Sequence, residues 1–226
     1  MVKIEWFYDD IMFTGISREK LEDTISKKKD ILKKIVDHVK EIEGEAYTKL
    51  IELKTQPGYT SRYIDAMVLM NAVFLRLVRE RSERPEDVEK KVTILGEILL
   101  ENNIVEHDHV HIHENNSDSS ITIDWYKDIL EYLQVTDDEI EEYTKLVKEN
   151  IERIIKCIEY TQETPDTDYL FILKGWETTT MQGQIFKHVS VHVADGKPYL
   201  IYSEEYERYG EHMIYYFRLG RIVIGK

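Results

Sequence analysis

Cysteine is nearly missing from this sequence of 226 residues, which contains only Cys157. One cysteine excludes an intramolecular disulfide framework and is typical of a reducing compartment. The first ten residues, MVKIEWFYDD, hold no long apolar segment of the kind that a secretory signal requires. We therefore expect a cytoplasmic protein stabilised by its core, with Cys157 as a small core residue in a helix.

Long apolar runs are also missing. The most apolar stretch, AMVLMNAVFLRLV at 66–78, is interrupted by Asn71 and Arg76. A helix needs about 20 predominantly apolar residues to span a bilayer. The stretch therefore predicts a buried core helix and no membrane span.

Basic residues are outnumbered: 30 Lys and Arg stand against 44 Asp and Glu, for a net charge of −14. This charge opposes direct nucleic-acid binding, in which Lys and Arg replace the counterions of the phosphates. It favours solubility and is compatible with a basic protein partner. The sequence contains no Walker loop, GxGxxG or GxSxG motif, so it indicates none of the sites that these motifs build.

Apolar periodicity predicts helices over most of the first 160 residues. Alternating residues at 2–8 predict a strand, after which Ser17 is a candidate N-cap for a helical pattern that continues to Leu53. Further helices are predicted at 61–83, from Pro85 to 99, over WYKDILEYLQV at 125–135, and from the capping-box sequence TDDE at 136–139 to 161.

Strand patterns dominate beyond residue 168. YLFILKG is a candidate strand, QIFKHVSVHV and KPYLIYS predict a hairpin around Asp195-Gly196, and HMIYYFRL and RIVIG flank Gly220 as a second candidate hairpin. Helices and strands are thus segregated, which predicts an α+β fold. We expect a single domain, 1–226, with an N-terminal helical bundle (17–161) and a C-terminal antiparallel sheet (168–226) that the strand at 2–8 joins.

The segment HDHVHIH places a histidine at every second position of 107–113. In an extended chain these imidazoles share one face, and Val110 and Ile112 share the other. The turn-rich ENNSDSS and then ITIDW follow, which predicts a β-hairpin inserted between helices, with its histidines beside Asp124. The candidate metal ligands are His107, His109, His111, His113 and Asp124.

Two of these histidines, such as His109 and His111, can converge with Asp124 on one ion, and this donor set suits Zn, Ni, Co or Fe. His188 and His192 would complete the site if their strand lies nearby. The alternatives are surface side chains of an amphipathic ribbon, which we favour, a catalytic metal, and a cluster that responds to protonation.

Tyrosines gather near the C-terminus, where the loop SEEYERYGE mixes them with acids. Tyr206, Tyr209 and Tyr215 are the candidate contact residues, because tyrosine is enriched where proteins dock. The leading hypothesis is an acidic protein-binding module of inhibitor, immunity or viral accessory type. The alternatives are a metal-dependent hydrolase that uses the 107–113 strand and a nucleic-acid mimic, so whether the protein is an enzyme stays open.

Overall fold

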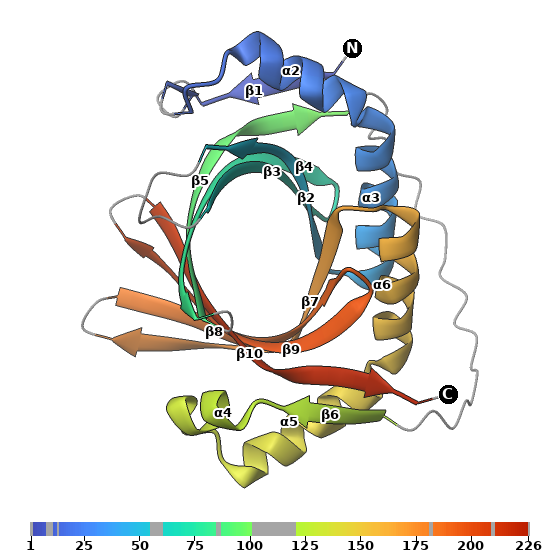
Figure 1. Ribbon diagram of the computed structural model, residues 1–226, viewed down its shortest axis with the longest axis vertical. Helices are drawn as coiled ribbons and strands as arrows, with labels where there is room; N and C mark the ends of the chain where they lie inside the picture. Colours follow the sequence, from blue (N-terminus) through green and yellow to red (C-terminus); the bar gives the residue numbers. More distant parts are fainter. Residues whose placement is uncertain are drawn as a thin grey trace.

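Strands rather than helices make up most of the protein, and they form one antiparallel sheet (Figure 1). The computed structural model describes residues 2–7, 11–12, 14–54, 61–84, 87–100, 121–180, 183–208 and 211–225. The first half contains β1 (Lys3–Trp6), α2 (Arg18–Lys27), α3 (Lys29–Ile42), β2 (Glu45–Leu53), β3 (Ser61–Leu69), β4 (Ala72–Arg84) and β5 (Asp87–Leu99). The second half contains β6 (Ile121–Trp125), α4 (Lys127–Leu133), α5 (Asp137–Glu149), α6 (Ile151–Glu163), β7 (Thr167–Thr180), β8 (Gly183–Ala194), β9 (Lys197–Arg208) and β10 (Glu211–Ile224).

The sheet closes into a barrel. Strands β2 to β5 form one four-stranded meander and β7 to β10 form another, and the two meanders join where β2 pairs with β7 and where β5 pairs with β10. Strands β1 and β6 extend the sheet outside the ring, β1 beside β5 and β6 beside β10. A barrel of eight strands has an interior wide enough for side chains or for one small ligand.

The two halves repeat the same architecture. Each begins with an outer strand, continues through helices and ends in a four-stranded meander, and the outer strand returns to the last strand of its own half. Both seams are antiparallel pairings between equivalent strands, as a two-fold axis through the barrel requires.

Details of the pairing repeat as well. Trp6 of β1 lies opposite Gly96 of β5, and Trp125 of β6 lies opposite Gly220 of β10. A Cβ atom at Gly96 would lie 2.4 Å from the Glu5 carbonyl oxygen, and one at Gly220 would lie 2.7 Å from that of Asp124, so both positions exclude a side chain. The register also shifts at corresponding places in the two meanders, before Gly96 on β5 and before Gly220 on β10. The pairing pattern therefore relates the paired residues of the first-half strands to equivalents in the second half.

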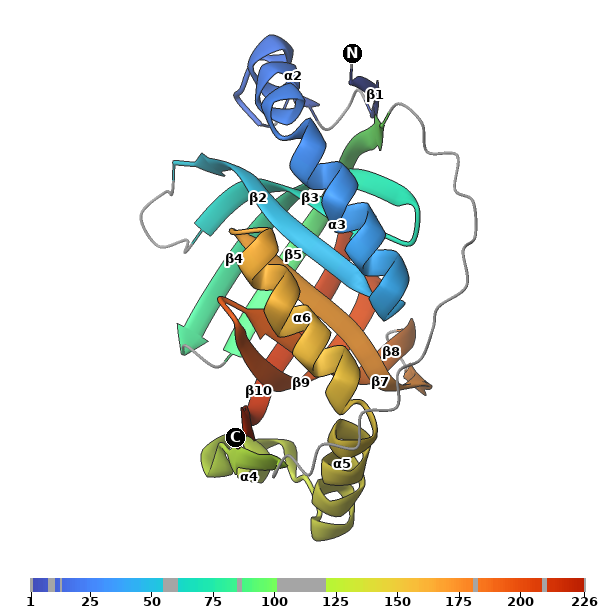
Figure 2. The same ribbon diagram turned by 90° about the vertical axis from the view of Figure 1, so that its right-hand side faces the viewer.

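The apolar core lies between the outside of the barrel and the helices. Helices α3 and α6 run side by side along the outer wall (Figure 2) and pack against β3 and β8. Val189, Val191 and Val193 of β8 are fully buried on the α6 side, and their neighbours His188 and Ser190 are also buried. Barrel strands are thus buried on both faces.

This two-sided burial explains why the predicted N-terminal helical bundle is wrong. The predicted helical segments at 45–53, 61–83 and 85–99 form β2, the β3–β4 hairpin and β5. Ile64, Asp65 and Ala66 are all buried at 2% exposure or less, which a strand achieves only when both of its faces are covered. A continuous apolar run of this kind does not separate a buried strand from a buried helix.

Other predicted elements are confirmed. Ser17 caps α2 by accepting a hydrogen bond from the Lys20 amide, and Thr136 forms a capping box with Glu139 at the start of α5. The hairpin at Asp195-Gly196 joins β8 to β9. The second hairpin, at Gly220, is wrong because β10 passes through this glycine with only a local register shift.

Candidate functional site

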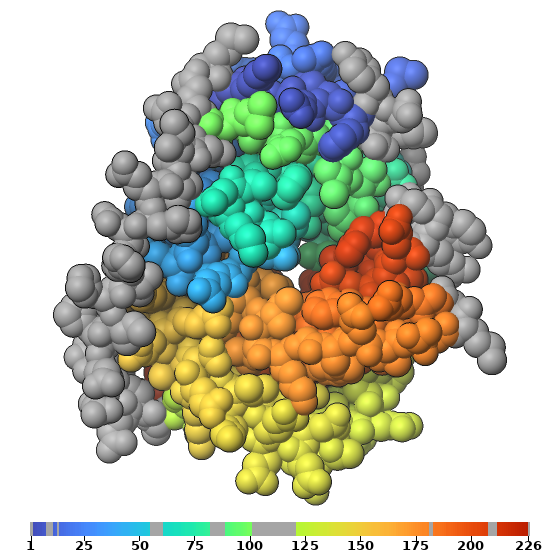
Figure 3. All heavy atoms as spheres, turned by 180° about the vertical axis from the view of Figure 1, so that it is seen from behind, coloured from blue at the N-terminus to red at the C-terminus, as the bar shows by residue number. Residues whose placement is uncertain are grey.

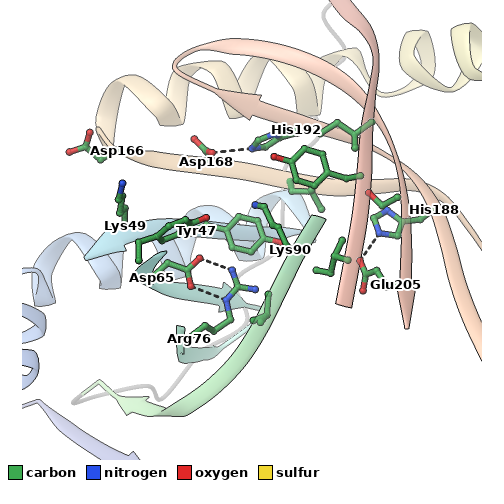
Figure 4. A pocket seen from close by; sticks show the side chains of 17 residues that line it. Tyr47, Lys49, Asp65, Arg76, Lys90, Asp166, Asp168, His188, His192 and Glu205 are labelled. Atoms are coloured by element: carbon green, nitrogen blue, oxygen red, sulfur yellow. Dashed lines mark hydrogen bonds and ion pairs between the residues drawn. The ribbon is translucent and has the colours of Figure 1, made fainter. Parts of the chain in front are cut away.

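The barrel encloses a cavity of about 340 Å³, lined by side chains from all eight of its strands (Figure 4). This volume is at the lower end of the roughly 300–1,000 Å³ of small-molecule sites. A narrow opening remains on the surface between the blue-to-green strands of the first half and the orange-to-red strands of the second (Figure 3). Four buried polar residues line the cavity: Asp65, Arg76, His188 and Ser203.

An ion pair joins two strands of the first-half wall, which is the part of the cavity lining that β2 to β5 provide. Asp65 of β3 and Arg76 of β4 lie opposite each other, because these strands pair in that register. The Arg76 Nε and Nη2 atoms donate to the Asp65 carboxylate at 2.9 and 2.7 Å, and the guanidinium lies 4.6 Å from the ring centre of Tyr47. Both side chains are buried, which makes this a desolvated bidentate pair. Lys49 of β2 lies opposite Asp65 on the other side of β3, and its side chain is nearly half exposed.

A third cation, Lys90, lies on β5. Its Nζ atom is 3.2 Å from Glu80 on β4, and Glu80 also accepts hydrogen bonds from Ser61 and Tyr63. Burial acts to lower the pKa of Lys90, but Tyr216, Tyr63 and Glu80 outweigh it and hold this pKa above its ordinary value. Lys90 is therefore a charged ammonium group at neutral pH.

The second-half wall carries carboxylates and imidazoles. His188 of β8 contacts Glu205 of β9 at 2.6 Å, and His212 of β10 contacts the other Glu205 oxygen at 3.2 Å. Burial acts to raise the pKa of Glu205, but hydrogen bonds from His188 and His212 outweigh it and lower this pKa to about 2. His192 contacts Asp168 at 3.1 Å. This wall offers acceptor oxygens beside imidazole rings.

Equivalent positions of the two halves carry different residues on the two walls of the cavity. Glu80 and Glu205 are equivalent, and each contacts the residue at the matching place of the neighbouring strand, Tyr63 or His188. The three first-half cations have no basic equivalent, because isoleucine occupies each matching position of the second half. By register, Lys49 corresponds to Ile172, Arg76 to Ile201 and Lys90 to Ile214.

The predicted histidine site lies outside the described residues, since these exclude 101–120 and with them His107, His109, His111 and His113. Asp124 is exposed on β6, opposite Arg221 of β10. Within the described ranges, no group of three or more His, Cys, Asp or Glu residues is placed to hold a metal ion. The predicted Zn, Ni, Co or Fe site therefore stays a prediction.

The predicted contact tyrosines lie partly within the structure. Tyr206 and Tyr215 stack with their ring centres 5.7 Å apart, whereas Tyr209 is outside the described residues. The sequence indicated only a supporting role for His188 and His192, it did not indicate Asp65 or Lys90, and Arg76 stood out only as an interruption of an apolar run. The available signal was a pair of opposite charges: Arg76 lies inside the most apolar stretch of the chain, 66–78, and Asp65 comes directly before it.

Comparisons with known proteins give no relative. No family model matches the sequence, and neither a curated protein nor a solved structure matches it. In the described part of the chain, none of the helices combines the length and apolar character needed to cross a membrane. The function must therefore be argued from the cavity and the surface of this protein.

Proposed function

We propose that the protein binds a small anionic molecule inside the barrel, with the anionic group held by the first-half cations. The observation that carries this proposal is the placement of Lys49, Arg76 and Lys90 on one wall of the cavity inside the barrel. Lysine and arginine are the usual side chains for phosphate and carboxylate recognition.

The cost of removing two of these cations, Arg76 and Lys90, from water supports a binding role. Removing an ion from water costs several kcal/mol even after relaxation, and apolar residues often replace a buried ion pair without loss of stability. The second half accommodates isoleucine at the matching positions, including Ile201 and Ile214 in the same cavity. The architecture itself therefore tolerates apolar residues at these places, and an anionic ligand is a reason for the cations in addition to their carboxylate partners Asp65, Glu80 and Glu52.

The opposite wall defines the rest of the ligand. Asp168 and Glu205 are acceptors, and the Ser203 hydroxyl is buried beside them. Such a wall suits hydroxyl or amino groups, which donate hydrogen bonds, and disfavours a second anionic group. The ligand that fits both walls is a phosphate- or carboxylate-bearing metabolite with donor groups at its other end.

Isothermal titration with phosphate, pyrophosphate, ATP and citrate at constant ionic strength tests the proposal. At least one of these anions is expected to bind saturably and to raise the melting temperature. Lys90→Ile together with Glu80→Gln removes one cation and its partner, so no carboxylate is left unpaired. A hydrogen bond to a charged group contributes about 1.5–3 kcal/mol, so this double variant is expected to weaken binding roughly 10- to 150-fold.

Lys174→Ile is the matched control, because Lys174 contacts Glu142 on the outside of the barrel. Affinity is expected to stay within about twofold of the wild-type value in this variant. Binding of none of the four anions, or an equal loss in the control and in the cavity variant, would contradict the proposal.

A further inference from the structure

The cavity reaches the surface beside the seam between β2 and β7. These strands form four residue pairs, the last of which joins Thr48 to Thr167. Continuing the same register, Lys49 and Asp166 are the next opposite positions, and both line the cavity. Asp166 is exposed, and the side chains of Lys49 and Asp168 are 45% and 43% exposed. A ligand can therefore reach charged groups of both signs at this end of the cavity.

The two aspartates at this end of the cavity have no basic partner from Lys or Arg among the described residues. Asp166 forms no hydrogen bond or ion pair there, and the Asp168 Oδ2 atom has one contact, at 3.1 Å from His192 Nε2. Lys49 is paired with Glu52 at 3.4 Å, and Figure 4 shows no interaction that joins it to either aspartate. A carboxylate accepts about four hydrogen bonds, so both aspartates keep acceptor capacity for a ligand.

The first-half equivalent of Asp168 is used within the protein itself. By register, Asp168 corresponds to Glu45 and Leu170 to Tyr47. Glu45 accepts a hydrogen bond of 2.5 Å from the Tyr47 hydroxyl and does not line the cavity. Leucine at the matching place of the second half removes this donor, so the Asp168 carboxylate is left to the cavity.

The same contrast holds for Asp166, which corresponds to Glu43. Both residues have a left-handed backbone, with φ of 61° and 49°. Burial lowers the pKa of Arg153, and the nearby charge of Glu43 opposes this shift, so Glu43 serves a cation of the protein. Asp166 has no such cation and lines the cavity instead.

Buried polar atoms without a hydrogen-bond partner gather on the same wall. His188 Nδ1, Ser190 Oγ and His192 Nδ1 are three of the six such side-chain atoms in the described ranges. They belong to alternate residues of β8, which places their side chains on the inner face of the barrel, and Ser190 is fully buried there. Native proteins satisfy nearly all buried polar groups, so this concentration indicates a functional wall rather than a packed core.

We propose that the ligand of the barrel is a small zwitterion, whose ammonium group is held by Asp166 and Asp168 and whose phosphate or carboxylate group is held by the first-half cations. This inference rests on the proposed function and adds the charge of the ligand's second end. A hydroxyl group would also donate hydrogen bonds to the aspartates. An ammonium group donates stronger, charge-assisted bonds and offsets the negative charge of two neighbouring carboxylates.

Isothermal titration with two matched pairs of compounds tests the proposal: O-phosphoethanolamine against ethyl phosphate, and 4-aminobutyrate against butyrate. Within each pair only the ammonium group differs. In at least one pair, the compound with the ammonium group is expected to bind about five- to tenfold more tightly, a moderate factor because both aspartates are partly exposed. The pair that shows the difference identifies the anionic group as phosphate or carboxylate.

The same titrations separate this inference from the proposed function. Binding of none of the four compounds would contradict both. Equal binding of the two members of each pair, or tighter binding of the compound without the ammonium group, would overturn the zwitterion alone and leave the anion site in place.

Asp168→Asn is expected to remove most of the difference within the pair and to leave the affinity for the compound without the ammonium group within about twofold. Asp166→Asn, in which asparagine tolerates the left-handed backbone, is expected to weaken binding of the zwitterion about two- to threefold. Asp23→Asn is the matched control, because Asp23 is exposed on α2 outside the barrel and pairs with Lys27. Circular dichroism of each variant verifies its fold. An equal effect of Asp168→Asn and Asp23→Asn, or an equal loss of both compounds in Asp168→Asn, would overturn the proposal.

Discussion

Replacing Asp65 and Arg76 by their second-half equivalents gives a sharp test of the fold. The matching pair is Ser190 and Ile201, so the double variant is Asp65→Ser with Arg76→Ile. Each single substitution leaves one buried charge without its partner, which costs about 3–5 kcal/mol. Typical domains have only about 5–15 kcal/mol of unfolding free energy, so each single variant loses a large part of the stability.

The double variant is expected to recover most of that loss, because replacing a buried ion pair by apolar or small residues is often neutral or stabilising by about 1–4 kcal/mol. Urea unfolding followed by tryptophan fluorescence gives the four free energies of the cycle. A coupling energy of at least about 3 kcal/mol is expected. Losses below about 1 kcal/mol in the single variants, or a double variant as unstable as their sum, would refute the paired register of β3 and β4.

Three further measurements test other parts of the structure. Burial raises the pKa of the Cys157 thiol to about 12, so a disulfide reagent at about pH 8 is expected to react only at the rate of unfolding. The folded-state pKa of Glu205 is about 2 against an ordinary 4.5, so its stabilising effect, at most about 3 kcal/mol, is complete above pH 4.5 and lost as the pH falls towards 2. The stability difference between wild type and Glu205→Gln is expected to shrink over that interval, and an unchanged difference would exclude this role. Gly220→Ala places a Cβ atom 2.7 Å from the Asp124 carbonyl oxygen and is expected to cost about 1–3 kcal/mol in a melting experiment; an unchanged melting temperature would contradict the close approach of β6 and β10.

Local chemistry made part of the fold predictable. The caps at Ser17 and Thr136 and the turn at Asp195-Gly196 each satisfy backbone groups within a few residues, so their signals are complete in a short stretch of sequence. The helices at 18–42 and 137–163 were predictable for the same reason, because one face is apolar and the other is exposed.

Local signals of this kind do not predict that the sheet closes into a barrel. Strands β3 and β4 are covered by helices or neighbouring strands outside and by cavity side chains inside, so they show little of the alternation of a half-exposed strand. Their turn, at Met70-Asn71, lacks the glycine that marks most tight hairpins, and Met70 has a φ of 54° instead. The apolar pattern of 61–83 therefore predicted a single helix.

The candidate site was missed for a related reason. Lys49, Arg76 and Lys90 lie on three different strands, and only pairing between those strands brings them to one cavity. An isolated lysine or arginine in the sequence has no spacing that predicts such a meeting. Tyr206, Tyr209 and Tyr215 could be proposed as contact residues because an abundance of tyrosine is visible in the composition of the sequence alone.

The two seams have a consequence for how the chain reaches its native state. Consecutive strands within each meander are at most seven residues apart in the sequence, but Ala46 must meet Tyr169 and Lys90 must meet Ile214 across more than a hundred residues of intervening chain. Such high contact order slows folding, since the entropy of closing a long loop is lost before the contacts form. During synthesis on the ribosome, the first meander has to wait for the second with its unpaired edges open, a state in which an aggregation-suppressing chaperone would have most effect.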